Sequence, residues 1–580
     1  MATTPAIEAI EATVAAPPAP RARRWAARPG EALAFGLVAL FLLAFLVVPV
    51  LTVITVAFQD RATGGFTLAH FGDFLSNDLF MRSFFNSLYV SLMSVAVASL
   101  IALPLAYFTT RFEFRGAILV QTLGVLPLIM PPFAGAVAMG LLFGRTGSVN
   151  LLLDEYLGIN IPFMEGLNGV IFVQSIHYFP FILLNLTASL KNIDRAMEES
   201  AQNLGAHGFR LFRRIVLPLA MPGYIAGASL VFIKVFDDLA TPLLLNVREM
   251  LAPQAYLRIT SVGLEDPIGY VISVVLILFS VLSLWISSLA LRGKDYATVQ
   301  RGGGGLVKRR MSRGQAIAAY ALIAAILLLV LAPHFGLFLL SIATIWSYSP
   351  LPDGYTLAHY TRVFAESSQY ITNTLIYAGL AGLIDVIIGT TIAYLVLRTR
   401  MVGARWLDYV AMSALAVPGL VLGIGYLRTF FGITLPDGSS LAAFWGIIVL
   451  ALAIRRLPYA LRACMAAMQQ ISASLEEAAE NLGARRLRVV RRIVLPLMAG
   501  GLAAGFVTSF ATAAVELSAT LMLVQSSDDA PLAYGLYVFM QSPAGRGAGA
   551  ALGIIAVVIV GLSTWLSHLV AEHGGGRKSA

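Results

Sequence analysis

Residues 198–219 read EESAQNLGAHGFRLFRRIVLPL, and residues 476–497 read EEAAENLGARRLRVVRRIVLPL. The two stretches match without a gap at an offset of 278 residues. Repetition at a fixed period indicates that a chain contains more than one copy of the same structural unit. Each copy follows the pattern Glu-x-Ala-x3-Gly-x9-Ile-x-Leu-Pro and lies in a polar gap between long apolar segments. The pair therefore predicts two equivalent surface elements on a duplicated fold.

Shorter matches extend the duplication toward the start of each copy. They are TLAHF (67–71) with TLAHY (356–360), NSLYV (86–90) with NTLIY (373–377), and Pro131 with Pro418. The last two share an offset of 287, which is nine residues larger than the offset of the long repeat. We therefore expect the first copy to carry a longer external loop near residues 143–167.

The composition points to lipid as the solvent. Of the 580 residues, 58% are hydrophobic and only 12% are charged, and the mean hydropathy is +0.81. Soluble domains carry about 25% charged residues. These values exclude a soluble enzyme, a disordered protein and a fibrous one. The single cysteine, Cys464, excludes an intrachain disulfide and a cysteine metal cluster, and we expect no metal site.

Apolar runs of 18 or more residues predict twelve membrane spans, six in each copy. Their approximate bounds are 33–58, 84–110, 117–142, 168–190, 218–246, 266–291, 315–346, 371–397, 405–432, 441–466, 498–525 and 547–571. An even number of spans per copy returns the chain to the same side, so both copies enter the membrane in one orientation. We therefore predict an all-α polytopic membrane protein with twelve transmembrane helices as two parallel six-helix repeats, related by a pseudo-twofold axis along the membrane normal.

The basic residues indicate the orientation. The chain carries a net charge of +9, and 29 of its 40 Lys and Arg residues fall on the side of the N-terminus. Under the positive-inside rule, both termini are cytoplasmic, and the charge needs no nucleic-acid partner. The predicted organisation is a disordered cytoplasmic tail (1–30), a first half (31–292), a cytoplasmic linker (293–313), a second half (314–572) and a cytoplasmic tail (573–580).

The repeated pattern resembles the EAA signature of the inner-membrane permeases of binding-protein-dependent ABC importers. The first copy departs from that signature at Ser200, where the family usually has Ala. The resemblance covers essentially the whole chain and implies the type I ABC importer permease fold, with each motif acting as a coupling helix on an ATP-binding subunit. The residues so assigned are Glu198, Glu199, Ala201, Gly205, Ile215, Leu217, Pro218, Glu476, Glu477, Ala479, Gly483, Ile493, Leu495 and Pro496.

The resemblance also implies partners and an activity. The sequence has no Gly-x4-Gly-Lys-Ser/Thr phosphate loop, so we expect no cofactor on this chain and ATP and Mg on a separate ATPase. The implied assembly has two copies of that cytoplasmic ATPase and a periplasmic solute-binding protein around a permease that is not itself an enzyme. The chain would be the channel of an ATP-driven importer in the bacterial inner membrane, moving a small solute into the cytoplasm by alternating access.

The solute is the least specific part of this prediction. The fused arrangement is similar to the ferric-iron and 2-aminoethylphosphonate branches of the family, and ferric iron is our first choice. The alternatives are 2-aminoethylphosphonate or another small solute, such as a polyamine or thiamine. A secondary transporter with two six-span halves explains the span count but not the duplicated motif. A membrane enzyme would need a cluster of His and carboxylates near an interface, which the sequence does not suggest.

Ionisable residues inside the fifth span of each half suggest a polar pathway. Lys234, Asp237 and Asp238 share one helical face, and Asp238 aligns with Glu516 in the second half. Such residues are costly in lipid unless they are paired or hydrated. They predict either an ion pair that stabilises helix packing or the lining of a translocation cavity or gate.

The fourth span of each half holds a second matched pair. His177 aligns with Arg455, and Arg456 follows directly. A double arginine this deep in a span is not expected to face lipid. It can reach back to the cytoplasmic side, pair with Glu516 or contact an anionic solute, and His177 is a candidate for the same pathway or gate.

Overall fold

The computed structural model describes residues 29–193, 195–291 and 310–575. The predicted tails and the linker therefore lie wholly or largely outside the described residues. The described chain is built of helices and contains three isolated β-bridges in loops. Nine of its helices are long and apolar enough to cross a membrane, and two bent helix pairs raise the number to eleven.

The first half contains six helical units that follow the predicted spans. They are α2 with α3 (Pro29–Leu42, Val48–Ala57), α5 (Asp78–Arg111), α6 with α7 (Ala117–Val125, Pro132–Phe143), α9 (Gly166–Lys191), α12 with α13 (Leu217–Phe236, Ala240–Leu244) and α15 (Pro267–Leu291). Shorter helices connect them. These are α4 (Ala69–Ser76), α8 (Ser148–Leu157), α10 (Arg195–Asn203), α11 (Gly208–Leu211) and α14 (Leu251–Leu257).

The second half repeats this order. Its long units are α16 (Arg313–Ile342), α18 (Ser368–Arg398), α19 with α20 (Ala404–Ser413, Gly419–Phe430), α21 (Gly446–Gln469), α25 with α26 (Ala499–Ala514, Thr520–Leu523) and α28 (Arg546–Gly575). The connecting helices are α17 (Ala358–Glu366), α22 (Ala473–Asn481), α23 (Arg486–Val489), α24 (Leu495–Leu497) and α27 (Leu532–Met540).

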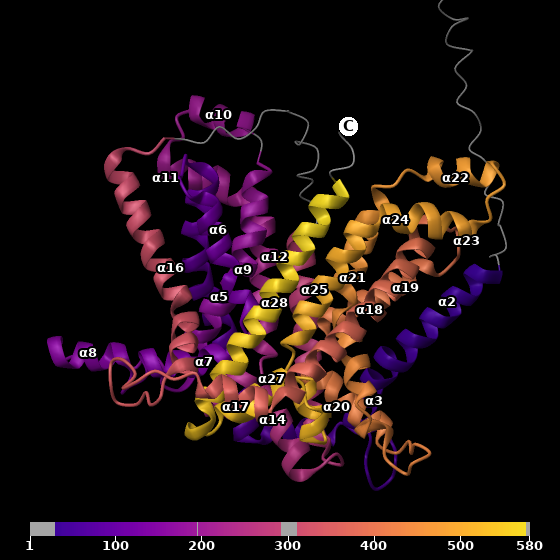
Figure 1. Cartoon of the computed structure of the whole chain (residues 1–580), viewed down its shortest axis with the longest axis horizontal. Helices are drawn as coiled ribbons and strands as arrows, with labels where there is room; N and C mark the ends of the chain where they lie inside the picture. The colour runs from indigo at the N-terminus through magenta and orange to yellow at the C-terminus, as the bar shows by residue number, and fades with distance from the viewer. Residues whose placement is uncertain (1–28, 194, 292–309, 576–580) are drawn as a thin grey trace, which may run out of the picture.

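Both halves have the same orientation in the bundle. Figure 1 places α10 and α22, which carry the start of the repeated motif, at the same end of the molecule. The start of α2 and the end of α28 lie at that end as well. Repeats related by inversion would place the two motif helices at opposite ends. The parallel arrangement predicted from the even number of spans is therefore confirmed.

Several predicted continuous spans are broken helices. The third span of each half breaks between α6 and α7 and between α19 and α20, and the second break bends the chain by 109°. The breaks fall at Pro131 and Pro418, because proline has no amide hydrogen to continue the helix. The tenth predicted span corresponds to α21, which carries three arginines and packs between α18 and α25. The apolarity count omits this span, and in place of the predicted third span it counts Pro132–Leu157, which joins α7 to α8.

The first helical unit of each half packs against the other half. Helix α3 lies against α20, and α2 against α18 and α19, whereas α16 packs on α5, α6 and α7 (Figure 1). The Tyr426 hydroxyl donates a hydrogen bond to the Phe45 carbonyl at 2.7 Å, and Thr429 bonds Thr52 at 3.1 Å. Each half thus contributes its first helical unit to the other half, and we call this arrangement the exchange of the first helical units.

The short repeated motif NSLYV/NTLIY has a structural explanation. The Ser87 hydroxyl accepts the Leu251 amide at 2.9 Å, and the Thr374 hydroxyl accepts the Leu532 amide at 2.6 Å. Each bond ties the second span to the helix that follows the fifth span, α14 in the first half and α27 in the second. The hydroxyl supplies an acceptor for a buried amide at the start of a helix, where no helical carbonyl is available.

The longer external loop expected in the first half is present as α8. Asn150 holds this loop together, because its side-chain amide donates to the Gly144 and Ile161 carbonyls at 2.9 and 2.8 Å and accepts the Ile161 amide at 2.9 Å. The second half has only a short turn at this place, closed by a bridge between Thr434 and Ser440. The loop accounts for the change of offset between the repeats.

Candidate functional site

The repeated motif forms a short helix that ends in a glycine turn. Gly205 and Gly483 both have a φ of +85°, the left-handed conformation that favours glycine. In each copy the residue after the glycine donates back across the turn, from Ala206 to the Ala201 carbonyl at 2.9 Å and from Ala484 to Ala479 at 3.0 Å. These bonds satisfy carbonyls at the helix end. The motif helix of each copy therefore ends at its glycine.

Each motif helix presents large apolar side chains to solvent. Leu204 is 88% exposed and Leu482 is 89% exposed, and the two leucines occupy equivalent positions just before the glycine turn. Met197 and Leu475, which lie seven residues earlier in each copy, are also exposed. Matched apolar residues at this degree of exposure are typical of an interaction surface.

The two glutamates at the start of each motif have different environments. Glu199 and Glu477 are exposed, whereas Glu198 and Glu476 are buried. The sequence suggested that all of these positions belong to one exposed docking surface, and this is wrong for Glu198 and Glu476. The pattern of identity between the copies does not distinguish a residue that faces a partner from one that faces the protein.

The buried glutamates form ion pairs with the ends of the second spans. Glu198 pairs with Arg111, the last residue of α5, and Glu476 pairs with Arg398, the last residue of α18, at 2.6 Å. The Arg398 guanidinium also donates to the Ile471 carbonyl at 2.6 Å. We call these two ion pairs the clamps. Each clamp fixes a motif helix to a long helix of the same half.

Sequence reasoning did not identify the clamp arginines, although a signal was present. Arg111 and Arg398 share the 287-residue offset of the neighbouring repeats, and both follow an apolar span directly. A basic residue there is expected for a cytoplasmic helix end in any case, so its sequence position gave no separate reason to pair it with the motif.

The remaining motif positions anchor the element in the bundle. Ala201 is buried and Ala479 half-buried, and the isoleucine and leucine of each copy are half-buried. The residues before each Leu-Pro pair form a π-helical turn, Phe212–Val216 and Val490–Val494. The prolines are exposed and follow this turn directly, and the residues on both sides of the junction keep helical backbone angles. The positions concerned are Ile215, Leu217, Pro218, Ile493, Leu495 and Pro496.

All of the predicted pathway residues line one cavity between the two halves. Its volume is about 160 Å³, and the helix break at Met130–Phe133 forms part of its wall. The predicted residues that line it are His177, Lys234, Asp237, Asp238, Arg455, Arg456 and Glu516. The alignment of the two halves therefore correctly predicted residues of one cavity, although those of the second half lie more than 200 positions after those of the first.

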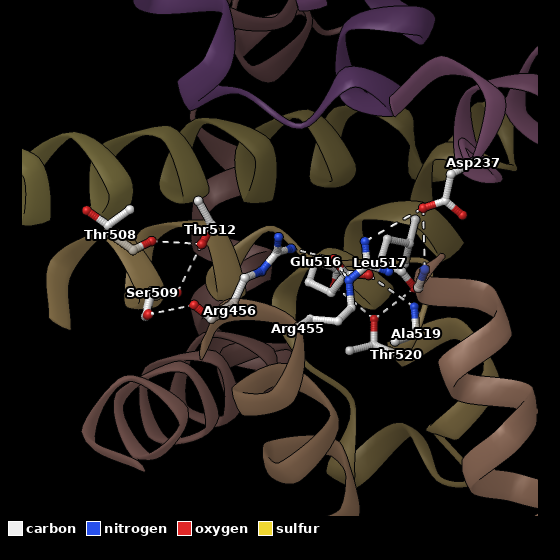
Figure 2. A network of polar contacts seen from close by, with 11 residues as sticks. Asp237, Arg455, Arg456, Thr508, Ser509, Thr512, Glu516, Leu517, Ala519 and Thr520 are labelled. Carbon is white, nitrogen blue, oxygen red and sulfur yellow. Dashed lines mark hydrogen bonds and ion pairs between the residues drawn. The ribbon is translucent and has the colours of Figure 1, made fainter. Parts of the chain in front are cut away.

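The double arginine contacts the acids of this cavity. Figure 2 shows both guanidinium groups directed toward Glu516. Arg456 Nη2 lies 2.5 Å from a Glu516 carboxylate oxygen, and Arg455 Nε lies 3.6 Å from the same oxygen. Arg455 also reaches Asp237 of the first half at 3.8 Å. Pairing with Glu516, one of the three options left open by the sequence, is what the structure contains.

Asp238 and Glu516 have the equivalent roles that their alignment suggested. Asp238 accepts the Ala240 amide at 3.3 Å and the Gln174 side-chain amide at 2.7 Å, and Glu516 accepts the Ala519 amide at 3.1 Å. Each carboxylate thus caps the short helix that follows a break in the fifth span. The predicted continuous spans 218–246 and 498–525 are wrong at these points, because the acids bond the backbone that a continuous helix would use.

Two residues near this cavity were missed by sequence reasoning. The Gly419 amide, at the start of α20, donates to the Asp237 carboxylate at 3.3 Å across the two halves. Asp385 on α18 is buried, and neither of its carboxylate oxygens has a hydrogen-bond partner among the residues that the structure describes. Lys234 makes no ion pair within the described ranges, so of the two alternatives that the sequence left open, its position agrees with the lining of a cavity.

The absence of a side chain at Gly419 is necessary for this network. A Cβ atom there would overlap the guanidinium of Arg455. We expect Gly419→Ala to displace Arg455 from Glu516 and Asp237 and to destabilise the protein by about 1–3 kcal/mol, as overpacking does. The thermal unfolding midpoint of the purified protein measures this effect. Gly432→Ala is the matched control, since a Cβ there meets nothing within 4 Å, and an equal loss in both variants would contradict the role of Gly419.

The sequence of the chain matches a known family model twice. The model describes the inner-membrane component of binding-protein-dependent transport systems, and it matches residues 94–295 and 385–573. The chain belongs to this family. Each matched segment contains one motif helix and one half of the central cavity, so the family unit corresponds to the structural repeat. The permease is therefore two family units in one chain, as the sequence resemblance implied.

The curated relatives differ in the solute that their names state. A ferric transport system permease protein, FbpB, from Actinobacillus pleuropneumoniae is 28% identical over 84% of this chain and 71% of its own length. A molybdenum transport system permease protein, ModB, from Escherichia coli is 32% identical over 36% of this chain and 96% of its own. A spermidine/putrescine permease protein, PotC, from Shigella flexneri is 27% identical over 46% of this chain and 94% of its own.

Proposed function

We propose that this permease is the channel of an ATP-driven importer in which two copies of a cytoplasmic ATPase dock on α10 and α22. The observation that carries the proposal is the pair of equivalent motif helices at one end of the bundle, each exposing a leucine before a glycine turn. Two identical docking elements on a pseudo-twofold axis suit a twofold partner. The ATP and Mg would be held by that partner.

Alternating access is the mechanism that suits this arrangement. ATP binding draws the two ATPase subunits together, and each clamp transmits the movement of its motif helix to α5 or α18. The central cavity lies between the halves and is closed by contacts that cross between them, from Asp237 to Arg455 and to Gly419. Separating the halves on one side breaks these contacts, and the polar cavity then opens to a solute.

Ferric iron is the solute that the relatives favour. The relatives that align over most of this chain are ferric permeases, whereas the molybdenum and polyamine permeases align with less than half of it. The receptor that delivers the solute would be a periplasmic binding protein, in keeping with the family description. A molybdate-like or phosphonate-like anion is the second candidate, because the cavity contains Lys234 without an ion pair among the described residues.

Uptake into proteoliposomes tests the proposal. We expect the permease, reconstituted with its ATPase and its receptor, to accumulate the receptor's solute only when ATP and Mg are present on the ATPase side. The matched control uses the permease without the ATPase. Accumulation that continues without ATP and follows an ion gradient would instead identify a secondary transporter.

A further inference from the structure

A second and larger cavity lies between the halves at the end of the bundle opposite the motif helices. Its volume is about 660 Å³, and its walls come from α7, α14 and the segment after α13 in the first half and from α27 and the start of α28 in the second. Figure 1 places α7, α14 and α27 far from α10 and α22. In the proposed orientation this cavity faces the receptor. We call it the outer vestibule.

The outer vestibule has an excess of positive charge. Arg248 and Arg546 line it, and no Asp or Glu does among the residues that the structure describes. Neither arginine makes an ion pair within those residues. Four other arginines at this end of the bundle are paired with a carboxylate, whereas Arg61 and Arg145, like the two vestibule arginines, make no ion pair within the described residues. These pairs are Arg82 with Glu249, Arg258 with Asp266, Arg362 with Glu366 and Arg428 with Glu265.

The structure holds both arginines in place without neutralising them. The Arg248 carbonyl accepts the side-chain amide of Gln254 at 2.9 Å, and the preceding turn contains Asn246 in a left-handed conformation with a φ of 57°. Arg546 begins α28, so the positive end of that helix adds to its charge. Its Nε atom is buried and has no hydrogen-bond partner in the described chain. A buried guanidinium donor without a partner is costly, and an anionic ligand would satisfy it.

The neutral polar residues of the vestibule complement this charge. Asn246, Gln541, Tyr256 and Tyr537 line the same cavity and carry amide or hydroxyl donors. Guanidinium groups and neutral donors are the groups that bind carboxylate, phosphate and related oxyanions. A bare metal cation would need oxygen ligands with negative charge, and the vestibule offers none from Asp or Glu in the described chain.

The central cavity differs from the vestibule, because three acidic and three basic side chains line it. Its three carboxylates already accept hydrogen bonds or ion pairs, as described above, whereas Lys234 is unpaired among the described residues. One oxygen of Asp237 and one nitrogen each of Arg455 and Arg456 also have no hydrogen-bond partner in the described chain. The excess of positive charge on the interface between the halves is therefore found in the outer vestibule.

We propose that the outer vestibule binds the solute through anionic oxygen groups, held by Arg248 and Arg546. The inference rests on the proposed function and narrows its substrate class. The anionic oxygens belong either to a free oxyanion or to ligands that accompany a ferric ion. In both cases the solute enters the permease as an anion and not as a bare cation.

Equilibrium binding to the complete permease in nanodiscs, with its ATPase subunits but without receptor, tests this inference. The probes are radiolabelled orthophosphate, molybdate and ferric citrate, with spermidine as a cationic comparison. We expect an anionic probe to bind and each of Arg248→Gln and Arg546→Gln to weaken it about tenfold, as loss of a charge-assisted hydrogen bond does. Arg362→Gln is the matched control, because Arg362 lies at the same end in a surface ion pair outside the vestibule.

The outcomes separate the possible sources of the anion. Binding of orthophosphate or molybdate alone identifies a free oxyanion, and binding of ferric citrate alone identifies iron with anionic ligands. The inference is overturned if no anionic probe binds at millimolar concentration or if spermidine binds more tightly than the anionic probes. It is also overturned if the variant that combines Arg248→Gln with Arg546→Gln binds the anionic probe as the wild type does. Arg248 is exposed, so Arg248→Gln still decides the matter if Arg546→Gln lowers the yield. Absence of ATP-driven uptake in a wild-type protein that binds anions would count against the proposed function alone.

Discussion

Leu204→Asp combined with Leu482→Asp is expected to abolish co-purification of the ATPase and to reduce ATP-driven uptake more than a hundredfold. Both leucines are almost fully exposed in the isolated permease. Burying a leucine side chain contributes about 1.5–3 kcal/mol, and a buried aspartate without a partner adds a further penalty. Because both docking sites contribute to ATPase binding, the losses of binding free energy at the two sites should add. Pull-down of the ATPase with the tagged permease measures the first effect.

Leu68→Asp combined with Leu357→Asp is the matched control. These two leucines are also exposed and occupy equivalent positions in the two halves, within the TLAHF and TLAHY repeats. They lie in the loops before α4 and α17, and Figure 1 places α17 at the other end of the bundle from α22. The control should retain the ATPase. Retention of the ATPase by the Leu204/Leu482 variant at normal yield would show that the motif helices are not the docking surface.

Glu476→Ala is expected to destabilise the permease by about 3–5 kcal/mol, because it leaves the buried guanidinium of Arg398 without its counter-charge. The neighbouring Glu477→Ala should change stability by less than about 0.5 kcal/mol, since Glu477 is exposed. Glu477→Ala should instead weaken ATPase binding, if that carboxylate faces the partner. The two substitutions remove the same side chain from adjacent positions and differ only in what the carboxylate contacts.

A double-mutant cycle isolates the clamp itself. The variants are Arg398→Ala, Glu476→Ala and the combination, with thermal unfolding and uptake measured for each. If the ion pair couples α22 to α18, the double variant should lose clearly less than the sum of the single losses. Additive losses would mean that the two residues act independently. Arg111 and Glu198 provide the same cycle in the first half, where a comparable coupling energy is expected.

The duplicated architecture could be predicted from the sequence because its signals are local and repeated. Long apolar runs identify the spans, and the matching offsets identify the halves and their relative orientation. The loop that contains α8 was predicted from the change of offset alone. The pathway residues could be predicted because ionisable groups in apolar segments are rare, so their alignment between halves was informative.

The helix breaks and the clamps could not be predicted in this way. The apolar run continues through Pro131 and through Asp238, so hydropathy does not show that the helix stops there. Whether a helix stops at such a point depends on what satisfies the freed backbone groups. At the Pro418 break Asp237 accepts the Gly419 amide, and at the breaks in the fifth spans Asp238 and Glu516 accept backbone amides. The burial of Glu476 depends on Arg398, which is 78 residues away in sequence. Such a contact is a property of the packed bundle.

The exchange of the first helical units also follows from packing and not from local sequence. Helices α2 and α16 are apolar over most of their length, so their hydropathy does not show which half each one covers. The contacts that decide the choice are specific, such as the hydrogen bond from Tyr426 to Phe45 and the close approach of Pro49 to Gly425. A side chain at Gly425 would overlap the Pro49 carbonyl.

Cross-linking at the motif helices tests the central claim most directly. The native Cys464 is buried, so cysteines introduced as Leu204→Cys and Leu482→Cys can be modified selectively with a thiol-reactive photo-cross-linker. In the assembled complex, each single variant should capture one ATPase subunit, and the double variant should capture two. Capture from Leu68→Cys and Leu357→Cys, with none from the motif positions, would contradict the proposal that α10 and α22 are the paired docking elements of an ATP-driven importer.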